Sequence, residues 1–304
     1  MNTLAQKPDW IAVDWGTSNL RAWAMASTGP VAEAGSADGM GQLAHDAFEP
    51  ALIRLIEPWL MTGVTPVIAC GMVGSRQGWH EAPYRTAPCT PLDAAQLTHV
   101  ATKDPRISFA IAPGIKQLTP PDVMRGEETQ IAGALMLQPE FDGVLCLPGT
   151  HTKWAHVAAG EVVSFQTFMT GEIFALLSTQ SVLRHGMTDG GWDDTAFDQG
   201  LADGLSRPDR IAARLFSLRA EGLIAGLQGP QARARLSGLL IGTELAGARP
   251  YWLGQKVAII GSAKLSAAYA RALAAQGLDA LILPADDCTI AGLASLARRT
   301  ERTQ

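Results

Sequence analysis

Two glycine-threonine turns hold the residues best suited to binding phosphate. The first, DWGTS at 14–18, ends a short apolar run, and the second, GTHTK at 149–153, ends another. Glycine lets backbone N–H groups approach a phosphate closely, and hydroxyl groups can donate to its oxygens. We therefore expect a phosphate clamp made of Gly16, Thr17 and Ser18 from the first turn and Gly149, Thr150, His151 and Lys153 from the second.

Asp14 stands at the start of the first turn and is the candidate metal ligand. At the end of a strand its carboxylate would point into a cleft and hold Mg²⁺ directly or through water. An Asp-x-Gly-Thr turn also occurs without any ligand, so the interpretation depends on its repetition. The chain contains neither GxxxxGK[ST] nor GxGxxG, which leaves the P-loop and dinucleotide-binding interpretations without support.

The elements that position these turns are expected to occur in two similar sets. In the first half the pattern predicts strands at 10–14, 19–26, 31–35, 66–70 and 107–112, and helices at 48–60, 91–101 and 127–137. In the second half it predicts strands at 143–147, 154–158, 162–168, 256–260 and 280–283, and helices at 172–247 (with breaks at 186–194 and 229–230), 265–275 and 290–298.

Each half thus opens with three strands, the first of which runs into a glycine-threonine turn. We interpret this as a duplicated α/β unit with a first lobe at 1–140 and a second at 141–304. A single doubly wound domain would also alternate strands and helices, but it leaves the repeated three-strand opening unexplained. The lobes would close on nucleotide phosphates in a cleft between them.

Composition narrows the class of protein. The 304 residues are 47% hydrophobic and 17% charged, as in ordinary globular proteins, and the net charge of -5 without a basic stripe argues against nucleic-acid binding. No apolar stretch reaches the roughly 20 residues of a membrane span, and no signal peptide is evident. The four cysteines form no CxxC pair, so we expect free thiols and a cytoplasmic location.

Three longer segments resemble a known family. GMVGSRQGW at 71–79, LPGTHTKW at 147–154 and FMTGEIF at 168–174 are similar to the 2-dehydro-3-deoxygalactonokinase family. The paired turns, with Gly261 and Ser262, also resemble the phosphate and adenosine motifs of the actin, hexokinase and Hsp70 superfamily. The resemblance implies a ribonuclease H-like (actin-like ATPase), two-lobed kinase that uses ATP and Mg²⁺. Its sugar-acid substrate would be 2-dehydro-3-deoxy-D-galactonate, phosphorylated on the 6-hydroxyl. Pro148 stands where superfamily members often carry Asp, which leaves metal binding to the first lobe.

The resemblance also suggests which residues act on the acceptor hydroxyl. Phosphoryl transfer to an alcohol usually needs a carboxylate near the attacking oxygen. Glu127 and Glu128, in MRGEET at 124–129, begin a predicted helix at the place where hexokinase-like relatives carry the catalytic carboxylate. Glu127 is the first choice and Glu128 the second, although acidic residues favour helix N-termini through the helix dipole alone.

A sugar acid needs an arginine partner for its carboxylate. Arg76 is the stronger candidate and Arg125 the weaker, and both lie in glycine-containing loops. Arg125 is also counted among the catalytic candidates. The further substrate-binding candidates, for which loop packing or helix capping is the alternative, are Gln77, Trp79, Glu81, Tyr84 and Glu172. Other acceptors, or an actin-like nucleotide switch, remain alternatives, and the oligomeric state is open, a homodimer included.

Overall fold

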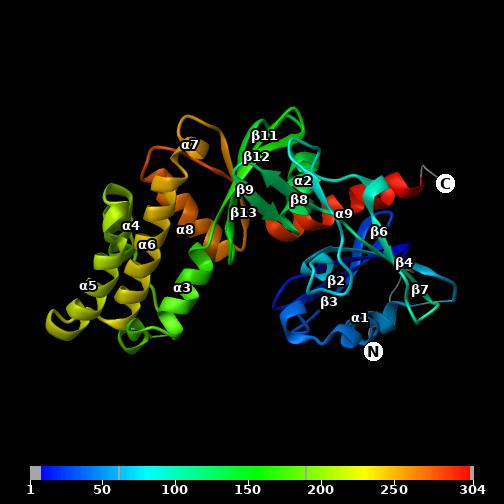
Figure 1. Ribbon diagram of the computed structural model, residues 1–304, viewed down its shortest axis with the longest axis horizontal. Helices are drawn as coiled ribbons and strands as arrows, with labels where there is room; N and C mark the ends of the chain where they lie inside the picture. The colour runs from blue at the N-terminus through cyan, green and yellow to red at the C-terminus, as the bar shows by residue number, and fades with distance from the viewer. Residues whose placement is uncertain (1–7, 61, 189, 302–304) are drawn as a thin grey trace. The chain divides into compact units, whose positions relative to one another are not determined.

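The computed structural model describes residues 8–60, 62–188 and 190–301 (Figure 1). The segment 1–7, where no signal peptide was expected, lies outside them. The chain forms two compact units. Unit 1 comprises the described residues of Met1–Phe141, Ala158–Ser164 and Ala285–Gln304, and unit 2 comprises Asp142–Val157 and Phe165–Pro284. The last helix, which the division at 140/141 placed with the second lobe, thus belongs to unit 1.

Unit 1 is built on a six-stranded sheet in the order β3-β2-β1-β4-β7-β6. Its strands are β1 Trp10–Trp15, β2 Leu20–Ala26, β3 Gly29–Ser36, β4 Thr65–Gly71, β6 Thr98–Val100 and β7 Ile107–Ile111. β1 pairs antiparallel with β2 and parallel with β4. The central strands are buried on both faces, which explains why their sequences are almost continuously apolar.

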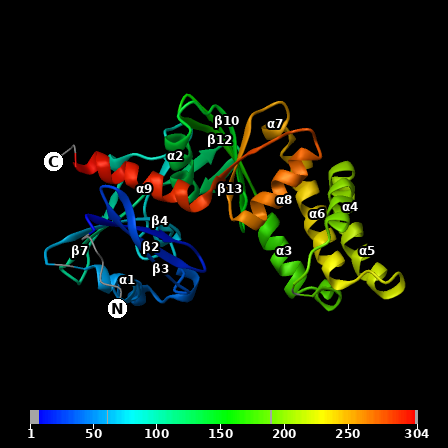
Figure 2. The same ribbon diagram turned by 180° about the vertical axis from the view of Figure 1, so that it is seen from behind.

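Helices cover both faces of this sheet. Helix α1, Phe48–Ile56, buries Phe48, Leu52 and Ile56 in one core cluster. On the other face, α9, Ala285–Glu301, contributes Leu293 and Leu296 to a second cluster. α9 packs beside α2, Glu127–Leu137, as the view from behind shows (Figure 2). α9 is longer than predicted because it begins directly after the last strand.

Helices α2 and α9 cross closely at two glycines. A β-carbon on Gly133 would lie 1.7 Å from the Cys288 carbonyl oxygen, and one on Gly292 would lie 2.1 Å from that of Thr129. These distances are shorter than any van der Waals contact, so the backbones touch only because both residues lack a side chain.

The helix predicted at 91–101 is wrong. This segment forms a short 3₁₀ turn, Ala94–Gln96, followed by the edge strand β6, which pairs antiparallel with β7. Leu92, Ala94 and Leu97 pack against the sheet cluster that also contains Leu293, so tertiary packing outweighs the apparent helical spacing. The sequence also gave no signal for a separate three-stranded sheet of β5 Tyr84–Thr86, β8 Gly114–Leu118 and β9 Pro121–Met124.

Unit 2 repeats the arrangement of unit 1 with a five-stranded sheet in the order β12-β11-β10-β13-β14. The strands of this sheet are β10 Gly143–Leu147, β11 Thr152–Ala158, β12 Glu161–Phe168, β13 Val257–Gly261 and β14 Leu281–Pro284. Residues 158–164, where β11 ends and β12 begins, are grouped with unit 1. β10 pairs antiparallel with β11 and parallel with β13, as β1 does with β2 and β4. The repeated antiparallel opening, and with it the duplicated α/β fold, is confirmed.

The helices of unit 2 are α3 Thr170–Thr179, α4 Asp194–Ser206, α5 Ile211–Ile224, α6 Gly229–Gly247, α7 Arg249–Trp252 and α8 Ala263–Ala274. α6 contacts α3, α4, α5 and α8 (Figure 1). α4 approaches α6 closely, since a β-carbon on Gly200 would lie 2.2 Å from the Arg235 carbonyl oxygen. The long helical region predicted at 172–247 is therefore divided into α3, α4, α5 and α6, with the first three packed against α6.

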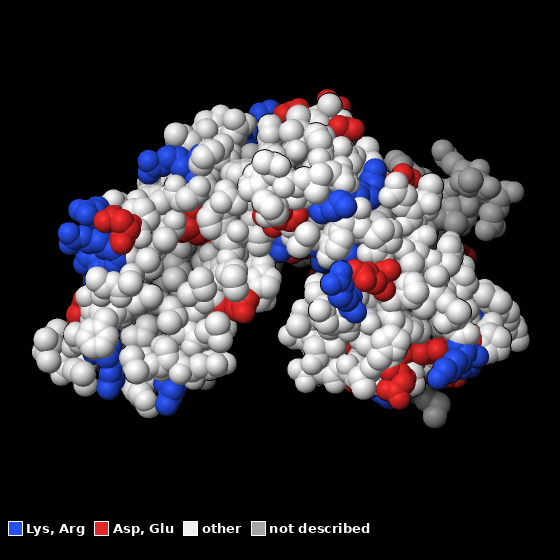
Figure 3. All heavy atoms as spheres, in the orientation of Figure 1, with Lys and Arg blue, Asp and Glu red and all other residues white. Residues whose placement is uncertain are grey.

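No helix among the described residues has both the length and the apolar character needed to cross a membrane. On the face drawn in Figure 3, acidic and basic side chains are interspersed over both units.

Candidate functional site

In unit 1, three backbone segments meet at the carboxyl end of the sheet. A β-carbon on Gly71, at the end of β4, would lie 2.7 Å from the Trp15 carbonyl oxygen and 3.4 Å from Asp14 Oδ1. One on Gly126, just before α2, would lie 3.3 Å from the Gly71 Cα. Both glycines have positive φ, 92° and 106°, which other residues rarely adopt. The fold thus brings Asp14 close to the start of the helix that carries Glu127 and Glu128.

The first glycine-threonine turn is held in place by a following loop. Gly16 donates its N–H to the Asn19 carbonyl at 2.9 Å, and Met40 donates to the Gly16 carbonyl at 2.9 Å. Gly39 has no room for a side chain, because its β-carbon would lie 2.2 Å from the carbonyl carbon of Ser18. Thr17 and Ser18 remain exposed, so a phosphate can reach their hydroxyls and N–H groups.

Asp14 is paired with a cation that the sequence analysis missed. Arg21, opposite Asp14 in the strand register, donates to Asp14 Oδ2 at 2.6 Å and also pairs with Asp286 at the start of α9. A lone arginine within the apolar β2 strand was the available signal. Within residues 8–60, 62–188 and 190–301, no three His, Cys, Asp or Glu side chains are grouped to hold a metal ion. Mg²⁺ often takes only one or two protein carboxylates besides phosphate and water, and Asp14 fits that role.

The two glutamates at the start of α2 lie in different environments. Glu128 is fully buried, and both of its oxygens accept from the Gly126 N–H, at 2.9 and 2.7 Å. Burial, with the nearby Glu127 charge, raises the pKa of Glu128 to about 8. Glu127 is half-buried, and its Oε2 accepts from the Arg125 N–H at 3.0 Å. Of the pair, only Glu127 has a carboxylate within reach of solvent.

The two candidate arginines differ in their exposure to solvent and in their partners. Arg125 is buried, donates to the Ala82 carbonyl at 2.7 Å and lies over the Tyr84 ring, 4.2 Å from its centroid. Its guanidinium therefore fixes the loop before β5. The Arg76 side chain is 81% exposed and lies 3.6 Å from Glu81, so it can turn toward a ligand at little cost.

The remaining candidates in this loop are split between core and surface. Trp79 is buried in the core of unit 1, where its ring stacks on Phe109 with centroids 4.5 Å apart. Gln77 and Glu81 are exposed, and Tyr84 is half-buried beneath Arg125. The geometry leaves Arg76, Gln77 and Glu81 accessible.

In unit 2, the second glycine-threonine turn packs against the start of α3. Glu172 donates its N–H to the Thr150 carbonyl at 2.9 Å, and a β-carbon on Gly171 would lie 2.1 Å from the Gly149 carbonyl oxygen. The Glu172 carboxylate pairs with His151 Nε2. Lys153 is buried and donates to the His151 carbonyl at 3.2 Å. Glu172 thus belongs to the same cluster as the turn.

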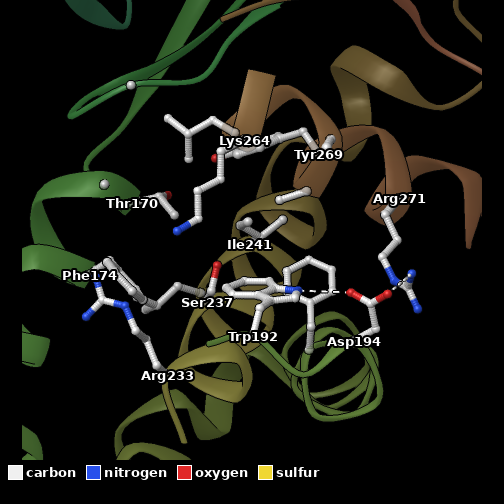
Figure 4. A pocket seen from close by; sticks show the side chains of 17 residues that line it. Thr170, Phe174, Trp192, Asp194, Arg233, Ser237, Ile241, Lys264, Tyr269 and Arg271 are labelled. Carbon is white, nitrogen blue, oxygen red and sulfur yellow. Dashed lines mark hydrogen bonds and ion pairs between the residues drawn. The ribbon is translucent and has the colours of Figure 1, made fainter. Parts of the chain in front are cut away.

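A pocket of about 550 Å³ opens beside this turn (Figure 4). It is bounded by Gly149, by the first turn of α3 at Thr170 and Gly171, and by residues of α6 and α8. Its walls are mainly apolar, and its lining includes Phe174, Trp192, Phe197, Leu240, Ile241 and Leu265. The predicted Gly261 and Ser262 directly precede α8, whose Lys264 and Leu265 line the pocket.

Cationic side chains frame this pocket. Lys264 extends from α8 toward Thr170 and Ser237, with Nζ 5.9 Å from the centroid of the Trp192 ring (Figure 4). The Arg233 guanidinium lies over the Phe174 ring at 4.9 Å. Trp192 is fixed by a 3.0 Å hydrogen bond from its indole N–H to Asp194. No short motif in the sequence marks this pocket, because its lining residues come from four helices (α3, α4, α6 and α8) and two loops.

A buried carboxylate lies behind the pocket wall. Glu244 on α6 is 2% exposed and accepts from the Trp154 indole N–H and the Tyr269 hydroxyl, each at 2.8 Å. The Thr152 hydroxyl lies 3.0 Å from that of Tyr269. Burial raises the pKa of Glu244 to about 7, whereas its hydrogen bonds, including those from Thr170 and Thr152, act in the opposite direction.

Comparison with known proteins shows to which family the chain belongs. Residues 14–296 match the family model described as 2-keto-3-deoxy-galactonokinase. The chain belongs to this family. It is 38% identical over 298 residues to a Rhizobium meliloti (strain 1021) protein named as a 2-dehydro-3-deoxygalactonokinase, covering 95% of this chain and 96% of the relative. It is 35% identical over 292 residues to the 2-dehydro-3-deoxygalactonokinase of Escherichia coli (strain K12), covering 95% and 97%.

Solved structures agree with this family membership. A crystal structure of a Sinorhizobium meliloti protein described as a 2-dehydro-3-deoxygalactonokinase matches with a TM-score of 0.89 at 38% identity, covering 95% of this chain and 96% of the other. The activator of 2-hydroxyisocaproyl-CoA dehydratase from Clostridium difficile, solved with ADPNP, matches with a TM-score of 0.54 at 11% identity, covering 97% and 96%, and shows the fold alone. The chain is a carbohydrate kinase with the actin-like ATPase fold.

Proposed function

We propose that this chain transfers the γ-phosphate of ATP to the 6-hydroxyl of 2-dehydro-3-deoxy-D-galactonate and releases the 6-phosphate and ADP. The observation that carries the nucleotide half of this proposal is the pocket of unit 2. Its volume of about 550 Å³ and its apolar walls suit a nucleoside. The adjoining second turn and the first turns of α3 and α8 offer backbone N–H groups to phosphate.

In this proposal the nucleotide base lies among Phe174, Trp192 and Ile241, and Lys264 neutralises phosphate charge at the mouth of the pocket. In unit 2 the Thr150 hydroxyl is the proposed donor to phosphate oxygens, and in unit 1 the Thr17 and Ser18 hydroxyls are the proposed donors. Asp14 would hold Mg²⁺, which when bound neutralises charge on the phosphates. Arg21 keeps the Asp14 carboxylate in one orientation through their 2.6 Å ion pair.

Glu127 is the proposed general base. The 6-hydroxyl oxygen forms a bond to the γ-phosphorus as the bond to the β-γ bridging oxygen breaks, and the hydroxyl proton passes to the Glu127 carboxylate. Glu128, which is buried and bonded back to Gly126, supports the start of α2 in this proposal. Arg76, the more exposed of the candidate arginines, binds the acceptor carboxylate.

The test is ADP release with MgATP and a panel of acceptors: 2-dehydro-3-deoxy-D-galactonate, 2-dehydro-3-deoxy-D-gluconate, galactonate, galactose, glycerol and none. We expect rapid turnover with the first and little with the others. Glu127→Gln is expected to lower kcat by about 10²–10⁴-fold, the usual contribution of a general base. A contaminating kinase would not respond to this substitution. Turnover without any acceptor, or equal turnover with galactose, would contradict the assigned substrate.

A further inference from the structure

Glu244 joins three elements that line or adjoin the nucleotide pocket. Its donors are Trp154 and Thr152 in β11, Tyr269 in α8 and Thr170 at the start of α3. Thr170 and Tyr269 also line the pocket, and Thr152 belongs to the second glycine-threonine turn. A single buried carboxylate on α6 therefore connects the phosphate turn, the first turn of α3 and the helix that carries Lys264.

A carboxylate suits this position because it offers about four acceptor sites and no donor when ionised. All four surrounding side chains can donate. Replacing the carboxylate with an apolar group would leave several buried donors without an acceptor, which costs more than the bonds contributed. The donors would then have to move toward other acceptors, and Thr170 and Tyr269 form part of the pocket wall.

We propose that Glu244 is a positioning residue for nucleotide binding: it holds Thr152, Thr170 and Tyr269 so that the second turn, α3 and α8 keep the pocket in its binding shape. This proposal rests on the proposed nucleotide site in unit 2. It assigns Glu244 no contact with the nucleotide, since the carboxylate is buried behind Tyr269 and Thr170. The acceptor site in unit 1 should therefore not respond to changes at Glu244.

The test compares Glu244→Leu, Glu244→Gln and Tyr269→Phe by calorimetric titration with the non-hydrolysable analogue AMP-PNP and Mg²⁺, and by steady-state kinetics. We expect Glu244→Leu to raise the Kd for AMP-PNP and the KM for ATP by about tenfold or more, the effect of losing one charge-assisted hydrogen bond. The KM for the sugar acid should change by less than about twofold. Glu244→Gln, which keeps one acceptor oxygen, should recover part of the loss.

Tyr269→Phe removes one donor without changing the ring, so it tests the hydrogen-bond network even if Glu244→Leu fails to fold. For Tyr269→Phe we expect a smaller rise, about threefold, in the Kd for AMP-PNP. Ser178→Ala is the control, since Ser178 is buried on α3 and its hydroxyl donates to the Ala175 carbonyl of its own helix. Unchanged nucleotide affinity in both Glu244→Gln and Tyr269→Phe would overturn the positioning role. Failure of the wild-type protein to bind AMP-PNP would overturn the nucleotide site as well.

Discussion

At the scale of single residues, the adjacent glutamates Glu127 and Glu128 lie in different environments. Glu127 and Glu128 both begin α2, yet only Glu128 is turned into the protein, where it accepts from the Gly126 N–H. Burial favours the neutral form of Glu128, and the charge of Glu127 adds to this effect. Proximity in the sequence made both residues candidates, with Glu127 ranked first, and the fold shows that their environments differ.

The raised pKa of Glu128 predicts a pH-dependent stability. Between its usual value of 4.5 and about 8, Glu128 is protonated in the folded protein but ionised in the unfolded chain. The favourable contribution of Glu128 to the free energy of unfolding is therefore complete below pH 4.5 and is lost as pH rises toward 8. We expect the stability of Glu128→Gln, relative to wild type, to increase with pH across this window, by up to about 1.4 kcal/mol per unit.

Urea unfolding at pH 5, 6.5 and 8 measures this difference. Glu140→Gln is the matched control, since Glu140 is exposed, and it should follow wild type at every pH. Parallel pH profiles for wild type and Glu128→Gln would show that Glu128 is ionised in the folded protein throughout.

At the scale of elements, the contact between α2 and α9 depends on the absence of side chains. Gly133→Ala would place a methyl group 1.7 Å from the Cys288 carbonyl oxygen, and backbone cannot yield as a flexible side chain can. We expect a loss of roughly 1–3 kcal/mol or more in the free energy of unfolding. Gly186→Ala is the control, with open space at its β-carbon and an expected change within about 0.5 kcal/mol. Equal stability of the two variants would mean that α9 does not pack on α2 in this way.

The sequence could predict elements whose signals are local. The strands around both glycine-threonine turns were found because apolar runs end at turn residues, and the repeated opening followed from them. Segment 91–101 was misjudged because Leu92 and Leu97 have a spacing that also suits a strand and turn packed on the sheet. The pocket could not be predicted, since Trp192, Arg233 and Lys264 meet only through the packing of α6 and α8 with the loop before α4. Glu244 gave no signal either, because a glutamate on a helix is usually exposed.

At the scale of the whole molecule, the chain is divided discontinuously. Unit 2 consists of Asp142–Val157 and Phe165–Pro284, so the chain returns to unit 1 at 158–164 and again at Ala285. The formal net charge of the whole chain is -5. Binding of a polyanionic nucleotide would therefore depend on local cations such as Lys264 and Arg233.

The rise in Tm that a bound nucleotide causes in the intact protein tests whether nucleotide binding depends on Lys264. A ligand at 100 times its Kd stabilises the folded state by about 2.7 kcal/mol, which raises Tm by roughly 5–10 °C for a unit of this size. We expect AMP-PNP with Mg²⁺ to raise the Tm of the wild-type protein in this range, and to raise that of Lys264→Ala less at the same ligand concentration. Lys256→Ala is the charge-matched control, because Lys256 is exposed in unit 2 but does not line the pocket. If Lys264→Ala and Lys256→Ala show the same Tm shift as wild type, the nucleotide phosphates do not lie beside α8, and the pocket of unit 2 is not their site.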